Sequence, residues 1–115
     1  MGGTFEYALA VRAVAAYTAV TAVVRQRLCV VVHSDVRYRT VTFRPWDAKR
    51  SDLTVYAAVL DTGHGLSKLV LTARDDRDGS IVDLADYSAR FFADTARRLR
   101  SQAGDTTDAL VLGGT

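Results

Sequence analysis

The sequence predicts an α+β fold, in which an antiparallel β-sheet of about six strands precedes a long C-terminal helix and a short apolar tail. Two observations support it. Between residues 28 and 74, β-branched and aromatic residues alternate with polar ones in runs separated by turn residues, as in paired strands. From residue 81 to residue 102, apolar residues instead recur every three or four positions, as on one face of a helix. The 115 residues therefore fit one domain, 1–115.

Composition narrows the class of protein. The chain is 49% hydrophobic and 24% charged, which is ordinary for a folded domain, and its net charge of only +2 excludes a polycation. Any binding of nucleic acid must therefore come from the placement of basic residues. The N-terminus lacks the basic start of a signal peptide, and no uncharged apolar run is long enough to cross a membrane. We expect a soluble protein that does not bind membranes.

Chemistry-bearing residues are few. Cys29 is the only cysteine, so an internal disulfide is excluded, and its position in an apolar run predicts a buried, inert thiol. His33 and His64 lie far apart without a second cysteine, so no metal site or cofactor is expected. No nucleophile, base and orienting residue can be assembled, which makes an enzyme with a small-molecule substrate the weakest hypothesis.

The first third of the chain contains one clear strand and one ambiguous stretch. Residues 5–11 alternate apolar and polar residues, which predicts a strand. In residues 13–24 the alanines favour a helix, whereas the valines and threonines favour a strand. We expect strands there, with an amphipathic helix as the alternative.

A hairpin is predicted at the centre of the chain. Strands at 28–33 and 36–43 flank the turn residues Ser34-Asp35, and Pro45 ends the second strand. Because side chains alternate between the faces of a strand, one face of the second strand is polar from end to end. It carries Tyr38, Thr40, Thr42 and Arg44. A second hairpin joins strands at 53–60 and 66–74 through the Gly-rich loop 61–65.

The C-terminal helix is predicted to begin at a capping box made by Ser80 and Asp83, with Asp75, Asp76 and Asp78 placed before it where a helix N-terminus favours negative charge. Its apolar stripe includes two adjacent phenylalanines and is wider than one small sheet needs. We therefore expect part of it to contact a second subunit. The stripe is Ile81, Leu84, Ala85, Ser88, Phe91, Phe92, Thr95 and Leu99. The apolar cluster 109–112 is also expected to pack on a neighbour.

Several stretches resemble the coat proteins of single-stranded RNA bacteriophages. They are Arg-Gln-Arg-Leu at 25–28, the strand that ends in Phe43-Arg44-Pro45, Leu-Val-Leu-Thr at 69–72 with the acidic turn after it, and Asp-Ala-Leu-Val-Leu at 108–112. The order of the expected elements is also similar. The resemblance covers roughly residues 17 to 112.

This resemblance implies a virion protein made in the host bacterial cytoplasm. Its dimer would interlock, with the helices of each subunit clasping the partner's sheet, and many dimers would close into an icosahedral shell. Contacts between subunits would come from Leu84, Phe91, Phe92 and Leu99. The inner face of the sheet would bind single-stranded genomic RNA through Arg27, His33, Tyr38, Thr40, Thr42, Arg44, Lys68, Thr72 and Arg74. Independently, basic residues neutralise phosphates and tyrosine can stack on an unpaired base.

Two other interpretations remain open. The same polar residues could form only the solvated face of an antiparallel sheet. Alternatively, the chain could be a small protein-interaction module, such as a secretion chaperone or an immunity protein. That module would bind its partner through the helical stripe and would require residues 13–24 to be helical.

Overall fold

The computed structural model describes residues 4–27, 29–45 and 52–103 of the chain. Its strands form one antiparallel sheet in the order β1-β5-β4-β3-β2, and the short β6 pairs with β5. This confirms the predicted α+β class with a six-stranded antiparallel sheet and a C-terminal helix. The elements in chain order are β1 (Thr4–Leu9), α1 (Ala13–Gln26), β2 (Val30–Asp35), β3 (Thr40–Arg44), β4 (Leu53–Gly63), β5 (Leu66–Asp75), β6 (Ile81–Val82) and α2 (Ala85–Ala103).

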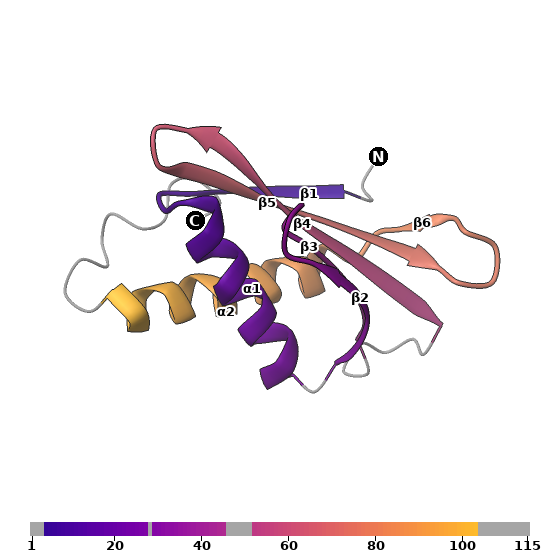
Figure 1. Cartoon of the computed structure of the whole chain (residues 1–115). Helices are drawn as coiled ribbons and strands as arrows, with labels where there is room; N and C mark the ends of the chain where they lie inside the picture. The colour runs from indigo at the N-terminus through magenta and orange to yellow at the C-terminus, as the bar shows by residue number, and fades with distance from the viewer. Residues whose placement is uncertain (1–3, 28, 46–51, 104–115) are drawn as a thin grey trace.

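Both helices lie on the same face of the sheet (Figure 1). Helix α1 packs against α2 and against β3, β4 and β5, while α2 also contacts β1. Stacked aromatic rings join the two layers: Phe43 lies 5.5 Å from Phe91, and Tyr7 lies 4.4 Å from Phe92, between ring centroids. The opposite face of the sheet carries no helix in the described part of the chain.

The prediction of strands over residues 13–24 is wrong, because α1 occupies this stretch. Its buried side chains recur at helical spacing, from Ala13 through Ala16 and Tyr17 to Val20, Val23 and Val24. Burial of this stripe against the sheet outweighs the weak preference of valine and threonine for strands. The hydroxyl of Thr18 donates to the carbonyl of Val14, which is typical of threonine within a helix.

The turn of the first hairpin also lies later than predicted. Residues 36–39 form it, and the Asp35 carboxylate accepts hydrogen bonds from the backbone N–H groups of Arg37 and Tyr38. Arg39 adopts a left-handed backbone, with φ of 55°. A bulge between Val31 and His33 shifts the register, so these two residues point to opposite faces of the sheet.

Helix α2 begins at Ala85, later than the predicted capping box. Ile81 and Val82 pair with β5 instead, and Ile81 is exposed, so it does not belong to the helical stripe. Asp83 accepts a hydrogen bond from the backbone N–H of Ala85, so it still lies at the start of the helix. Asp75 and Asp78, however, accept backbone hydrogen bonds within the turn between β5 and β6 rather than capping α2.

Trp46 and the predicted apolar cluster 109–112 fall outside the described residues. In the described part of the chain, neither helix combines the length and the hydropathy that crossing a bilayer would require.

Candidate nucleic-acid interface

Most of the predicted RNA-binding residues lie on the uncovered face of the sheet, which we call the open face. Strand pairing places His33 beside Thr42, Thr42 beside Tyr56, Tyr56 beside Thr72, and Thr72 beside Thr4. This row crosses all five main strands at right angles. With neighbouring strands about 4.8 Å apart, it is about 19 Å long. Arg44, Lys68, Arg74 and Thr40 occupy the same face on either side of this row.

Tyr56 stands at the centre of the open face and is 43% exposed. Together with Thr72 and Arg74 it lines a shallow hollow. Tyr56 is not among the residues predicted for the site, although it alternates with Val55 and Ala57, which face the core. An exposed ring flanked by hydroxyls and a guanidinium group is suited to stack on an unpaired base.

Acidic residues partly neutralise the basic side chains of the open face. Lys68 Nζ lies 2.9 Å from the Glu6 carboxylate, and Arg44 Nη2 lies 3.6 Å from the Asp76 carboxylate. The guanidinium group of Arg74 donates to the backbone oxygen of Gly79 and makes no ion pair within the described residues. Asp76, which was predicted to lie before the N-terminus of the helix, thus pairs with Arg44 of the open face instead. Arg74 is the basic group on this face with the least compensated charge.

Two predicted RNA-binding residues lie elsewhere. Arg27 follows α1 on the helical side, where its guanidinium group pairs with Asp94 at 2.7 Å and lies over the rings of Tyr87 and Phe91. Tyr38 belongs to the turn between β2 and β3 and is 66% exposed. The assignment of Arg27 to the sheet face was wrong because the chain leaves α1, rather than a strand, at this point.

The residues predicted to contact a second subunit are already covered by their own chain. Phe91, Phe92 and Leu99 are buried in the core between α2 and the sheet, and Leu84 is partly buried against the same core. Phe91, Phe92 and Leu99 therefore present almost no surface in a single subunit, and their contact with a second subunit stays a prediction. Helix α1 also covers part of the sheet, so the apolar stripe of α2 is buried against the sheet and α1 of the same subunit.

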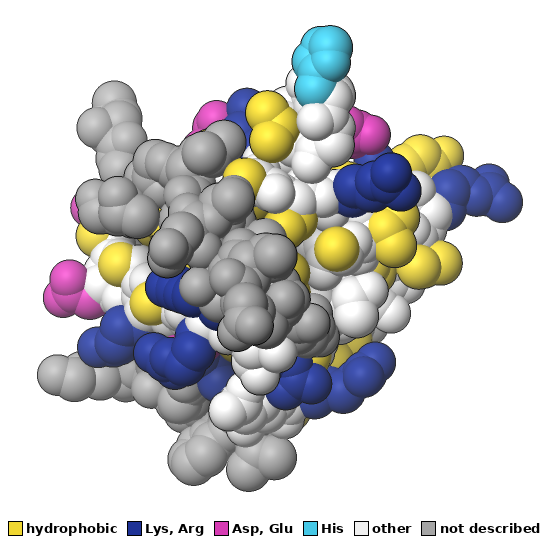
Figure 2. Space-filling view, turned by 90° about the vertical axis from the view of Figure 1, so that its left-hand side faces the viewer, with side chains coloured by type: hydrophobic (Ala, Val, Ile, Leu, Met, Phe, Trp, Pro, Cys, Tyr) yellow, Lys and Arg dark blue, Asp and Glu magenta, His cyan; other side chains and the backbone are white. Residues whose placement is uncertain are grey.

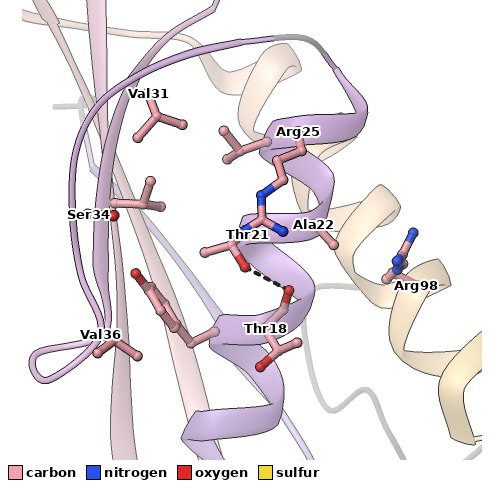
Figure 3. Close-up of a pocket in the computed structure, with 11 residues that line it drawn as sticks. Thr18, Thr21, Ala22, Arg25, Val31, Ser34, Val36 and Arg98 are labelled. Carbon is pink, nitrogen blue, oxygen red and sulfur yellow. Dashed lines mark hydrogen bonds between the residues drawn. The ribbon is translucent and has the colours of Figure 1, made fainter.

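A groove of about 660 Å³ lies on the helical side, between α1 and the edge strand β2 (Figure 3). Tyr17 borders it and donates a hydrogen bond from its hydroxyl to the backbone oxygen of Thr40 at 3.0 Å. Burial raises the pKa of the Tyr17 phenol, and the Asp35 carboxylate raises it further, while Arg25 lowers it. The groove therefore combines apolar walls with polar and basic groups.

The remaining reactive groups support no further site. Cys29 precedes β2, is only partly buried, and its sulfur lies 3.9 Å from the Tyr87 hydroxyl. Among the residues that the structure describes, no three histidine, cysteine or acidic side chains converge as a metal site would require.

Comparison with known proteins identifies no family. No family model and no curated protein matches the chain. Similar solved structures include the di-domain ARO/CYC BexL from the BE-7585A biosynthetic pathway, at 13% identity and a TM-score of 0.48. The match covers 85% of this chain and spans 43% of that chain. A solution NMR structure from Thermobifida fusca matches at 14% identity and a TM-score of 0.49, covering 89% of this chain and 82% of that one.

Proposed function

We propose that the protein binds single-stranded RNA across the open face of its sheet. The observation that carries this proposal is the placement of Tyr56 at the centre of an uncovered antiparallel sheet, with Arg44, Lys68 and Arg74 around it. Sheets of this kind bind single strands by stacking two or three bases on exposed aromatic rings while basic side chains contact phosphates. The row of side chains through Tyr56, about 19 Å long, is long enough for two or three bases.

The charge distribution supports a weak, salt-sensitive and sequence-tolerant interaction. Threonine hydroxyls surround the tyrosine, and the basic groups are few and partly paired. Because each neutralised phosphate releases counterions, the logarithm of affinity falls by about 0.7 per phosphate contact for each tenfold rise in salt. Contacts with Arg44, Lys68 and Arg74 alone should therefore produce a slope near −2.

The wider role of a shell-forming coat protein rests on the sequence resemblance. In that layout strands precede the central hairpin and the helices clasp a partner's sheet, whereas α1 occupies residues 13–26 here and α2 covers the sheet of its own chain. RNA binding does not depend on that layout. The proposal of RNA binding by the open face therefore stands without homodimers and shells, which are proposed from the resemblance alone.

The test is fluorescence anisotropy of a labelled single-stranded oligouridylate at several salt concentrations. The variant Arg44→Ala with Lys68→Ala should bind at least tenfold more weakly than the parent, with a shallower salt dependence. Glu6→Gln, which frees Lys68 from its ion pair, should strengthen binding. Weaker binding by Glu6→Gln would contradict the assigned role of Lys68.

A matched control is available on the other layer. Arg90→Ala with Arg100→Ala removes the same charge from exposed positions on α2, which lies behind the sheet as seen from the open face. This control should retain affinity. Equal losses in both double variants would mean that net charge, rather than the open face, governs binding, and an absence of binding by the parent would refute the proposal.

A protein-interaction module is the second candidate, and one observation favours it. The alternative required residues 13–24 to be helical, and α1 is helical. Its predicted binding stripe, however, is buried within the chain, so any partner would use the groove beside α1 instead. Binding of a partner protein at the groove, with an affinity that single-stranded RNA does not change, would favour this function.

A further inference from the structure

The groove between α1 and β2 has an apolar wall that nothing in the described chain covers. Val31 of β2 is 46% exposed and Val36, just after it, is 78% exposed, although both border the groove. Across from them lie Tyr17 and Val24 of α1. Among the described strands β2 is also the edge of the sheet, and one side of its backbone pairs with no other described strand. An exposed apolar edge of this kind favours pairing with an extended segment.

Two basic residues border this groove. Arg25 comes from α1 and Arg98 from α2 (Figure 3). Neither guanidinium group makes a hydrogen bond or an ion pair with any other side chain of the described residues. Figure 2 shows that Lys and Arg side chains predominate over the lower half of the end of the molecule where α2 terminates. The groove thus fits an occupant that combines carboxylates with aliphatic side chains.

We propose that this occupant is the tail of the same molecule, residues 105–112. In its sequence, DTTDALVL, Asp108 directly precedes four aliphatic residues and Asp105 lies three positions before Asp108. The carboxylates would face Arg25 and Arg98, and the aliphatic residues would cover the exposed valines. The groove lies on the helical side of the sheet, so this proposal is independent of RNA binding by the open face.

The length of the chain permits this contact within one molecule. Helix α2 ends at Ala103, only five residues after Arg98, which is about 7.5 Å along a helix. From there the six residues to Ala109 can span up to about 20 Å when extended. The chain after Ala103 is therefore long enough for residues 109–112 to reach the groove.

Paramagnetic broadening in the full-length chain tests the contact. A nitroxide label is attached through Thr107→Cys in a Cys29→Ser background, and amide signals of the isotope-labelled protein are recorded. We expect strong broadening at Thr18, Thr21 and Ser34, which are part of the groove, and none at Thr72 on the open face. The substitutions Leu110→Asp and Leu112→Asp should abolish the broadening while the other amide signals show that the fold is intact.

Two controls test whether charge holds the tail in the groove and whether the tail comes from the same molecule. Arg25→Gln with Arg98→Gln should at least halve the broadening, whereas Arg100→Gln, in the same helix but outside the groove, should not change it. A sample that mixes label-bearing chains with isotope-labelled chains reports contacts between molecules. Groove broadening in that mixture would show that a second copy supplies the tail and would overturn the proposal. Absence of groove broadening in both samples would also overturn it.

Discussion

Arg27 and Asp94 lie 67 positions apart in the sequence yet form a part-buried ion pair that joins the end of α1 to the middle of α2. Both Nε and Nη2 of Arg27 donate to the same carboxylate oxygen, at 3.1 and 2.7 Å. The guanidinium group also lies 5.2 Å from the centre of the Tyr87 ring. These contacts hold the two helices together on the helical side of the sheet.

We expect Arg27→Gln to lower the free energy of unfolding by about 2 kcal/mol, because it removes a charged donor from a site only 15% exposed and leaves Asp94 without its buried partner. Arg97→Gln is the matched control. Arg97 pairs with the same carboxylate at 2.8 Å but is 73% exposed, so its loss should change stability by less than about 1 kcal/mol. Urea unfolding measures both, and equal effects would contradict the role assigned to burial.

This pair also shows what the sequence could not supply. Arg27 was assigned to the RNA-binding face through the resemblance to phage coat proteins, and its partner Asp94 is recognisable only after both helices are in place. Thr40, Thr42 and Arg44, in contrast, were correctly placed on one face because alternation within a strand is a local property. His33 shares that face only through a bulge, which strict alternation along a strand does not predict.

Helix α1 could have been found from periodicity alone. Its buried residues recur at intervals of three and four, whereas a count of β-branched residues favoured strands. Tyr56 was missed for a different reason: its role depends on lying beside Thr42 of β3 and Thr72 of β5, which is a consequence of strand order. Pairing between distant strands is therefore the part of the site that sequence patterns predict least well.

Tyr17→Phe should lower stability by about 1 kcal/mol at neutral pH, because it leaves the backbone oxygen of Thr40 without the hydroxyl donor. Alkaline pH provides a second measurement. Since the pKa of Tyr17 is raised in the folded state, folded Tyr17 holds its proton more tightly than unfolded tyrosine. The stabilisation that Tyr17 contributes to folding is complete below 10.0, the ordinary pKa of tyrosine, and is lost as pH rises from there through the folded pKa. Thermal unfolding between pH 9 and 11 should show a smaller decline in Tyr17→Phe than in the parent, and an equal decline would argue against a buried phenol.

Ser67→Ala should leave stability unchanged or raise it by about 1 kcal/mol. The Ser67 hydroxyl is buried on β5 and has no hydrogen-bond partner among the described residues, so removing it relieves the cost of burying an unpaired polar group. Ser88→Ala on α2 offers a comparison at a buried serine that also faces the core side. A loss of more than about 1 kcal/mol in Ser67→Ala would indicate a hydrogen bond to an ordered water molecule.

Two exposed tyrosines lie in different parts of the molecule. Tyr56 lies at the centre of the open face, whereas Tyr38 lies in the turn between β2 and β3. If Tyr56 stacks on a base, Tyr56→Leu should weaken binding of a single-stranded oligouridylate by about 1–3 kcal/mol, while Tyr56→Phe retains the ring and most of the affinity. Tyr38→Leu removes a ring that is even more exposed, 66% against 43% for Tyr56, and should leave affinity unchanged.

Anisotropy titrations at several salt concentrations separate these outcomes. Because none of the three substitutions changes a charge at neutral pH, the salt dependence of binding should be the same in all of them. Loss of affinity in Tyr38→Leu but not in Tyr56→Leu would move the stacking contact from the sheet to the turn, where Arg37 and Arg39 would then supply the phosphate contacts.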